Sequence, residues 1–416
     1  MKTVRLLFIC ALFLSLSTGI SLAEEKKYGL QEVIEIALEK NPSASIFSAN
    51  IEAAKGSASS ASAYPNPEVG FEVGRGRSLD GSDSGGEYSI SIGQPLEWPK
   101  KRAFRRKAAK AALEATVHDT GAFNLELLFE VKQAFYQFIL NKKEEEIAGK
   151  NLETVNDLLR ISDLRVRAGE TPEFELVKAR VETLKAEKEL ARAKIRVDIA
   201  RVGLNSLLGN ALPEGFDVEG EFPSPEKRYD RGEIATAALE RHPLILRQSK
   251  EVEAKMYALE MERQSVIPDV TVKGFYGREI DKESYAVGFS APIPFWYQKK
   301  GEIATASAEK AKAEAELSKV RIELSLAVEQ AFKNYRIALD QIDVFDKGLL
   351  KQAEEALRIA ELTYRQGESG ILDYLDAQRI HRQTLLEYNQ ARYELFVYLA
   401  EIERVMGKID NQEKGS

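Results

Sequence analysis

The sequence of 416 residues contains the same pattern twice, about 200 residues apart. The matching segments are 37–42 and 238–243 (ALEKNP and ALERHP), 131–135 and 328–332 (VKQAF and VEQAF), and 167–171 and 365–369 (RAGET and RQGES). Solenoid repeats have periods of roughly 20–50 residues, so this repeat is too long to be one of them. The pattern predicts two similar halves related by a pseudo-twofold axis. The function is then expected in a structure that both halves line together.

The first 23 residues lie outside this duplication. Lys2 and Arg5 precede an apolar run over 6–16, and residues 21–23 (SLA) are suited to cleavage. This order is typical of a secretory signal peptide, and the run is too short to span a membrane. The one cysteine, Cys10, would be removed with it, so the mature chain is expected to form no disulfide. Lipid attachment at Cys10 is the weaker alternative, because the cysteine precedes the end of the apolar run.

Charge and composition argue against several classes of function. The formal net charge is −7, and loss of Lys2 and Arg5 makes it −7 − 2 = −9, which disfavours a nucleic-acid partner. The three histidines are His118, His242 and His381, and without a cysteine they offer a transition-metal site almost no ligands. No Gly-rich phosphate loop or nucleophile elbow is present in the sequence. We therefore expect no metal site, no cofactor and no enzymatic activity.

Most of the chain is predicted to be helical. Proline is absent from 101–169 and from 299–406, so long helices are expected within about 100–209 and 299–407. Apolar residues recur at heptad spacing, which indicates helices that pack along neighbouring helices. Examples are Leu350, Leu357 and Tyr364. An ordinary coiled-coil bundle would show the same periodicity.

Two segments, about 67–95 and 269–294, alternate between apolar and polar residues as the strands of a hairpin do. The apolar positions are Val69, Phe71, Val73, Tyr88, Ile90 and Ile92 in the first half and Val270, Val272, Tyr276, Tyr285, Val287 and Phe289 in the second. Runs of roughly ten residues with apolar-out, polar-in alternation are typical of transmembrane strands. Gly274 and Phe275 make one of these strands the least regular.

The two tryptophans, Trp98 and Trp296, lie 198 residues apart at matching ends of the hairpins. Other aromatic residues near these ends are Tyr64, Phe295 and Tyr297, and basic residues follow at Lys100, Lys101, Arg102, Arg105, Arg106, Lys299 and Lys300. Aromatic residues followed by lysine and arginine are typical of a membrane–water interface. The alternative is a water-soluble hairpin that buries both tryptophans as core anchors.

Two hairpins supply four strands, which is too few to close a barrel. Each unpaired backbone group costs several kcal/mol in lipid, so copies of the chain must pool their strands. Two copies would give a barrel filled by side chains, and three would leave room for a lumen. The helices must then continue the barrel as a tube. In this prediction 24–212 is the first repeat, 213–230 a linker, 231–408 the second repeat and 409–416 a disordered tail.

Residues 364–377 (YRQGESGILDYLDA) resemble the Tyr-x-x-Gly turn and the Asp-x-x-Asp-Ala motif of the TolC-type outer-membrane efflux family. The resemblance covers essentially all of the mature chain, and 292–295 (PIPF) with 301–304 (GEIA) resembles the heavy-metal resistance branch. It implies a mainly α fold with a small β part, assembled as a homotrimer. A twelve-stranded outer-membrane β-barrel would stand on a periplasmic α-helical barrel. This barrel would meet an inner-membrane pump through a periplasmic adaptor protein.

Matching turns join the last two helices of each half. Gly169 and Gly367 suit the left-handed position that ends a helix. Thr171 and Ser369 suit the N-cap of the next helix, with Pro172 at its first position. The family resemblance implies that these tips meet the adaptor. The residues implied are Arg167, Gly169, Arg365 and Gly367. The alternative is that they only form tight turns.

Asp373 and Asp376 are spaced i, i+3 and therefore share one face of a helix. If that face lines the tube, three copies place six carboxylates around a throat, where they repel anions and attract cations. The resemblance implies that this pair forms the periplasmic constriction. The alternative is that both carboxylates complement the positive end of the helix dipole. Glu175 and Lys178 stand at the matching positions of the first half, so the acidic pair is not duplicated.

The resemblance further implies a lock on the closed state, in which Tyr364 of one helix pair hydrogen-bonds to Glu175 of the other. This chain has Ser369 where some members of the family carry an arginine that completes the lock.

These features predict a passive exit duct of a tripartite efflux pump, because the sequence has no ATP site or proton-relay motif to supply energy. Heavy-metal cations are the first expected cargo, small organic drugs the second and secreted polypeptides the third. The alternatives from other classes are a periplasmic coiled coil without a pore and a self-sufficient nutrient porin.

Overall fold

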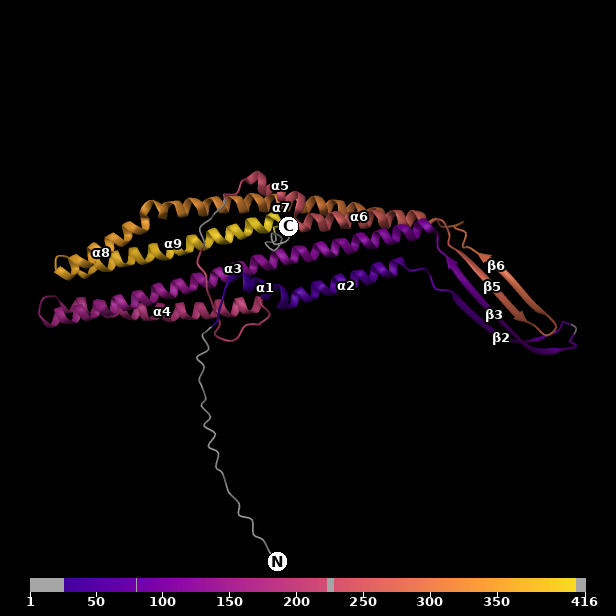
Figure 1. Ribbon diagram of the computed structural model, residues 1–416, viewed down its shortest axis with the longest axis horizontal. Helices are drawn as coiled ribbons and strands as arrows, with labels where there is room; N and C mark the ends of the chain where they lie inside the picture. Colours follow the sequence, from indigo (N-terminus) through magenta and orange to yellow (C-terminus); the bar gives the residue numbers. More distant parts are fainter. Residues whose placement is uncertain (1–25, 80, 223–227, 409–416) are drawn as a thin grey trace, which may run out of the picture.

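The computed structural model describes residues 26–79, 81–222 and 228–408 (Figure 1). The predicted signal peptide and the predicted C-terminal tail lie outside these residues. Within them, the mainly α architecture with a small β part is confirmed. The first half contains β1 (Lys27–Tyr28), α1 (Leu30–Lys40), α2 (Pro42–Ser62), β2 (Glu68–Arg77), β3 (Ser84–Leu96), α3 (Pro99–Arg167), α4 (Glu173–Leu207) and β4 (Asp217–Val218).

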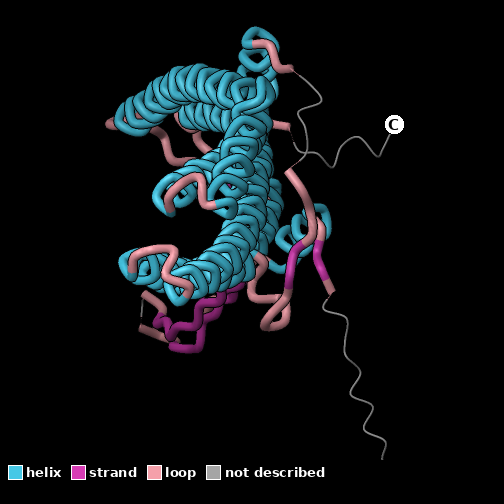
Figure 2. The backbone as a smooth tube through the Cα atoms, turned by 90° about the vertical axis from the view of Figure 1, so that its left-hand side faces the viewer, coloured by secondary structure: helices cyan, strands magenta, loops and turns pink. Residues whose placement is uncertain are grey.

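The second half repeats this order. It contains α5 (Arg231–Arg241), α6 (Pro243–Gln264), β5 (Val270–Arg278), β6 (Glu283–Ser290), α7 (Lys300–Val344), a π-helical turn (Phe345–Leu349), α8 (Leu350–Gln366) and α9 (Ile371–Met406). The molecule is elongated, with the sheet at one end and the α3–α4 and α8–α9 turns at the other (Figure 1). Seen along this axis, the helices form a curved wall with a concave and a convex face (Figure 2).

The two halves differ in their long helices. α3 runs without a break for 69 residues. Its counterpart in the second half is interrupted at the π-helical turn, where Gly348 has φ 110° and ψ 12°. The absence of proline from this segment indicated an uninterrupted helix, but glycine tolerates this conformation as well. α8 therefore leaves the line of α7 at an angle, as Figure 1 shows.

Both hairpins join one antiparallel sheet in the order β2-β3-β5-β6. The pairing of β3 with β5 connects the two halves and places Ile90 opposite Tyr276 and Ile92 opposite Gly274. Directly opposed residues share a face of the sheet. The least regular strand therefore keeps its apolar residues on the same face as those of β3. β2 and β6 remain as the two open edges.

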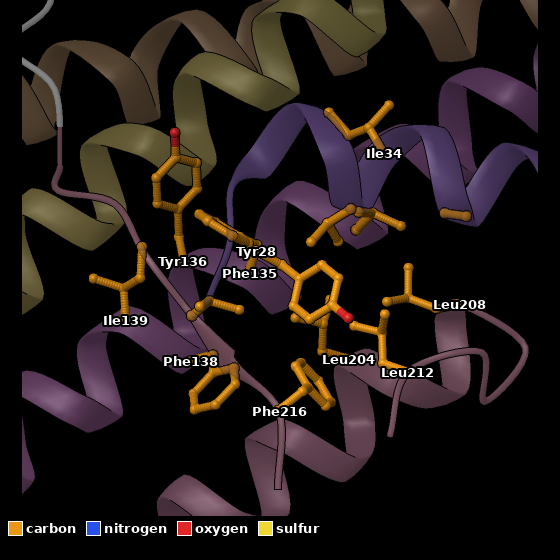
Figure 3. Packing of buried hydrophobic residues seen from close by; sticks show 14 of the residues in the cluster. Tyr28, Ile34, Phe135, Tyr136, Phe138, Ile139, Leu204, Leu208, Leu212 and Phe216 are labelled. Atoms are coloured by element: carbon orange, nitrogen blue, oxygen red, sulfur yellow. The ribbon is translucent and has the colours of Figure 1, made fainter. Parts of the chain in front are cut away.

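The largest core cluster lies where α1, α3, α4 and the segment after α4 meet (Figure 3). Phe135 and Phe138 of α3 are almost fully buried, as are Leu204 and Leu208 at the end of α4. Phe216 packs edge-on against Phe138 with ring centroids 6.0 Å apart. The segment that was predicted as a linker thus contributes apolar side chains to the core. A second cluster, built around Tyr335, Ala338 and Ile402, occupies the other half.

Two helix joints, one in each half, are built alike. Asn41 caps α2 by accepting from Ser43 N at 2.8 Å, and its Nδ2 donates to the Leu207 carbonyl at the end of α4, at 2.9 Å. Gly209 follows α4 with φ 66°, and a Cβ there would overlap the Lys40 carbonyl oxygen. The chain is thereby held so that α2 begins where α4 ends.

The second joint connects α6 and α9. His242 caps α6 by accepting from Leu244 N through Nδ1 at 3.2 Å. Gly407 follows α9 with φ 71°, and a Cβ there would lie 3.0 Å from the His242 Cα. A left-handed glycine and a side-chain cap therefore recur in both halves, with asparagine in one joint and histidine in the other.

Candidate functional site

One face of the sheet is apolar and open to the surroundings. On the edge strands, Val69, Phe71 and Val73 of β2 and Tyr285, Val287 and Phe289 of β6 are between 65 and 77 % exposed. Ile90 and Ile92 of β3 continue the band at 45 and 57 % exposure. Contiguous apolar surface of this kind is rare on soluble monomers and is typical of a lipid-facing strand.

The predicted interface aromatics cluster between the sheet and the helices. Tyr64 is exposed, and the Arg102 guanidinium lies 3.6 Å from its ring centroid. Trp98 is more enclosed, because its Nε1 donates to Gln264 Oε1 at 3.3 Å. Phe295 and Trp296 are 80 and 100 % exposed. The Tyr297 hydroxyl, also in this group, is bonded to Glu302 and to the Gly301 amide.

The helix tips at the other end are exposed hairpins. Gly169 and Gly367 adopt φ 74° and 78°, in the left-handed region that ends a helix. The guanidinium groups of the two neighbouring arginines point along their own helices, where Arg167 pairs with Asp163 at 2.8 Å and Arg365 with Glu361 at 2.6 Å. These pairs are exposed and weak, so both arginines remain available to a partner.

The predicted N-caps at these tips are wrong by one residue. Pro172 is the N-cap of α4 and Gly370 that of α9, and neither provides a side-chain hydrogen bond. The hydroxyl of Ser369 instead lies 3.0 Å from that of Thr363 across the turn. The extended backbone of Pro172, with ψ 149°, delays the start of the helix past Thr171.

Asp373 and Asp376 lie on the solvent side of α9, while Tyr374 between them is buried. The Asp376 carboxylate pairs with Arg379 at 2.5 Å. Asp376 also lines a groove of about 810 Å³ between α3, α4 and α9. The groove's charged residues are Lys178, Lys185, Lys188, Arg196, Arg379 and Arg382 against Glu144, Glu182, Glu189 and Asp376. Both carboxylates are thus exposed, and Asp376 lies beside basic side chains of which the sequence analysis had named only Lys178.

Tyr364 is 1 % exposed and belongs to the core of the chain. Its hydroxyl lies 3.2 Å from Ser162 Oγ of α3, and its ring stacks on Tyr374 with centroids 5.6 Å apart. Burial raises the pKa of Tyr374 to about 12. Glu175 on α4 is half-buried, and its Oε2 has no hydrogen-bond partner within the described chain. The tyrosine therefore bonds within its own chain, while the glutamate oxygen is buried without a partner among the described residues.

Sequence reasoning missed Ser162 and the stacking of Tyr374 on Tyr364. Ser162 is 202 residues from Tyr364 and carries no motif of its own. Only the packing of α3 against the α8–α9 pair brings the two hydroxyls together. The apolar i, i+3 spacing of Ile371 and Tyr374 was the one available signal that Tyr374 faces the core.

Among the described residues, no group of three or more histidine, cysteine, aspartate or glutamate side chains could hold a metal ion.

In the part of the chain that the structure describes, none of the helices combines the length and the apolar character needed to cross a membrane.

A curved helical wall that continues into a sheet with one apolar face defines the wall segment of a membrane channel. The family model for outer membrane efflux proteins matches residues 33–210 and 234–408. The chain therefore belongs to the outer membrane efflux protein family. It is an outer-membrane efflux channel rather than an enzyme, with its helical part in the periplasm. The resemblance seen in the sequence is confirmed.

Relatives with known roles share about a quarter of their residues with this chain. The cobalt-zinc-cadmium resistance protein CzcC of Cupriavidus metallidurans is 24 % identical over 381 residues, which are 91 % of this chain and 90 % of the relative. The nickel-cobalt-cadmium resistance protein NccC of Alcaligenes xylosoxydans is 24 % identical and covers 81 % of this chain and 75 % of its own length. The pyoverdine export protein OpmQ of Pseudomonas aeruginosa is 21 % identical over 84 % of this chain and 79 % of its own.

Solved structures show the same fold. The outer-membrane channel OprN has a TM-score of 0.77 at 20 % identity, and the match covers 91 % of this chain and 90 % of that one. CusC, a transmembrane channel, has a TM-score of 0.72 at 16 % identity over 91 % of this chain and 92 % of its own. The Campylobacter jejuni CmeC channel has a TM-score of 0.79 at 17 % identity over 91 and 85 %.

Proposed function

We propose that this protein is the exit duct of a tripartite efflux system and that it works as a homotrimer. The observation that carries this proposal is the pair of open edges, β2 and β6, on a sheet with an exposed apolar face. Backbone groups at such edges cannot remain unpaired in lipid. Three copies of the four-stranded sheet supply twelve strands, and β6 of each copy pairs with β2 of the next.

The duct itself is passive. An inner-membrane pump supplies the energy, and a periplasmic adaptor joins the pump to the exposed tips at Arg167, Gly169, Arg365 and Gly367. The interface aromatics anchor the barrel in outer-membrane lipid. The coiled coil without a pore is disfavoured, because it would leave the apolar face of the sheet without a function.

Heavy-metal cations are the proposed cargo. Two of the similar proteins are resistance proteins for cobalt, cadmium and either zinc or nickel. Exposed carboxylates at Asp373 and Asp376, three copies of each around the throat, favour cations electrostatically. The similarity to a pyoverdine export protein supports the second candidate, a small organic cargo.

The proposed duct is tested by measuring ion conductance. The full chain, purified and inserted in planar bilayers, is expected to form trimers with discrete conductance steps. Replacing both carboxylates (Asp373→Asn with Asp376→Asn) is expected to lower the cation-to-anion permeability ratio about two- to fivefold, because a ring of charge at a constriction sets ion preference.

The matched control is Asp198→Asn, which removes an exposed carboxylate on α4 away from the tip and should leave the ratio unchanged. A monomer without conductance steps would disprove the duct. If the channel conducts but its permeability ratio is unchanged by replacing Asp373 and Asp376, the proposed duct stands and these residues do not line its throat.

We further propose that Tyr364 and Glu175 hold the closed state between neighbouring helix pairs. The buried and unpartnered Glu175 Oε2 is an available acceptor, and the Tyr364 hydroxyl would exchange Ser162 for it. Tyr364→Phe combined with Glu175→Gln is then expected to raise single-channel conductance severalfold. Ser162→Ala, which removes only the partner within the protomer, should not. Equal conductance in the unchanged channel, the double variant and Ser162→Ala would show that Tyr364 acts only in the core.

A further inference from the structure

A cleft of about 370 Å³ lies between α3, α8, α9 and the segment that ends at Phe222. Its residues on α9, such as Tyr388 and Arg392, face away from the side of the helix that carries Asp376 and Arg379, since successive residues turn by about 100°. The cleft nevertheless adjoins the groove that contains Asp376, since Asn151, Gln378 and Arg382 line both. Its volume is within the range of small-molecule sites.

The cleft is open because α8 packs loosely after the break at Gly348. In its 17 residues, α8 buries only Ala353 and Tyr364. Leu350 and Leu357, two and nine residues after Gly348, line the cleft, and Leu357 also packs against the core cluster that contains Tyr374 of α9. An uninterrupted helix like α3 would continue in line with its neighbours.

The cleft has an aromatic lining held in place from behind. Phe222 is 3 % exposed and stacks against both Tyr136 and Phe396, with centroids 5.9 and 6.1 Å away, while those two rings also contact each other. Tyr388 packs against Phe345 of the π-helical turn at 5.3 Å. Both rings are fixed by their neighbours, and the partly exposed Tyr388 supplies more apolar surface to the cleft than the almost fully buried Phe222.

Two arginines stand at the cleft with neutral partners. Arg382 donates to Asn151 Oδ1 at 2.8 Å, and this buried amide oxygen also accepts from Gln378 at 3.1 Å. Arg392 donates to the Phe222 carbonyl oxygen, and its guanidinium lies 5.5 Å from the Phe222 ring and 5.6 Å from the Tyr388 ring. Among the ion pairs of the described residues, neither arginine has a carboxylate partner. Both guanidinium groups are held in place by hydrogen bonds, but no carboxylate among the described residues neutralises their charge.

The remaining charges at the rim leave an excess of positive charge. Glu146 is paired with Lys150 at 2.7 Å and with Lys143 at 3.8 Å, and Glu221 is the other acidic residue. Four basic residues thus face two acidic ones in a chain whose net charge is negative. Guanidinium groups held in this way are suited to carboxylate or sulfonate oxygens.

We propose that this cleft binds a small amphipathic organic anion. The apolar body of the ligand lies on Phe222 and Tyr388 and against Leu350 and Leu357, and its carboxylate or sulfonate contacts Arg382 or Arg392. Asp376 and Arg379 do not line this site, although it shares Arg382 with the groove that contains them. Its place beside the Gly348 break means that a bound ligand holds α8 against α9.

The test uses 8-anilinonaphthalene-1-sulfonate, an aromatic sulfonate, in calorimetric titrations of the full chain in lipid nanodiscs. Empty nanodiscs give the background from lipid. We expect saturable binding at one site per chain with a Kd on the order of 10–100 µM, which is typical for a ligand of this size. Arg382→Gln with Arg392→Gln is expected to weaken binding at least tenfold, because charge-assisted hydrogen bonds to the sulfonate are lost.

Leu357→Trp fills the cleft and should also abolish saturable binding while leaving both arginines in place. The matched control is Arg379→Gln, about one turn before Arg382 on α9 but outside the lining of the cleft, which should bind as the unchanged chain does. Far-UV circular dichroism confirms that each variant keeps its helices. Absence of saturable binding above the nanodisc background, or equal binding by all variants, would overturn the proposal.

Discussion

Gly209→Val is expected to destabilise the protein by about 2–4 kcal/mol, the largest effect predicted for a single substitution. The residue has φ 66°, a conformation that β-branched side chains rarely adopt. Its missing Cβ also leaves room for the Lys40 carbonyl oxygen at the joint between α4 and α2. Backbone strain of about 1 kcal/mol thus adds to a steric clash. The clash is with main-chain atoms, which cannot move aside by a change of rotamer.

Substitutions at two further glycines separate the cost of backbone strain from the cost of the steric clash. Gly169 has φ 74° but nothing within 4 Å of its Cβ position, so Gly169→Ala carries only the strain and should cost about 1 kcal/mol. Gly203 is helical with open space around it, so Gly203→Ala should stabilise α4 by about 0.5–1 kcal/mol. The measurement is the midpoint of thermal helix loss by circular dichroism. If Gly209→Val melted like Gly169→Ala, the joint would tolerate the added side chain.

The second large effect is a loss of stability in acid that depends on His242. This side chain is 5 % exposed, and burial together with the nearby positive charge of Arg404 lowers its pKa to about 4. Arg404 itself pairs with Glu401 at 2.7 Å and with Glu126 at 2.8 Å. The neutral ring is required because Nδ1 accepts the Leu244 amide hydrogen.

The direction of this pH dependence follows from the number of protons that the folded and unfolded chains bind. Between pH 6.5 and about 4 the unfolded chain binds a proton on this histidine that the folded chain does not, so stability falls as pH falls. A difference of about 2.5 pKa units corresponds to roughly 3 kcal/mol, all of it present above pH 6.5 and lost at about pH 4.

His242→Asn gives this joint the cap that Asn41 provides in the other half, so it should remove most of the pH dependence while keeping the helix joint. His381→Asn is the control, since it removes a histidine that caps no helix. The midpoint of unfolding, followed between pH 7 and pH 4, is the measurement. A slope that persists in His242→Asn would assign the acid sensitivity to other groups.

Local patterns in the sequence were sufficient for the architecture. Val69, Phe71 and Val73 alternate with polar residues because a strand places neighbours on opposite faces, and this alternation predicted the exposed apolar band. The glycines at 169 and 367 were identified as helix ends because few other residues adopt a left-handed backbone. The acidic pair at Asp373 and Asp376 was found from its helical spacing and from the Asp-x-x-Asp-Ala motif of the family.

Contacts between distant segments were beyond such patterns. The pairing of Tyr364 with Ser162 depends on how α3 meets the α8–α9 pair, and the break at Gly348 leaves no trace in the heptad periodicity. From the sequence alone, Arg382 and Arg392 are interpreted as two exposed cations on a helix. Their contacts with Asn151 and Phe222 become visible only in the tertiary structure.

The sequence by itself determined the duplicated plan, the four amphipathic strands and the helix ends, because each depends on residues within a few positions of one another. The tertiary structure decided which faces of those elements are covered. It sets the partner of Tyr364, the end-to-end joints at Gly209 and Gly407, and the cleft beside α8. The physical reason is that burial and pairing depend on groups brought together across some 200 residues of chain, which no local spacing encodes.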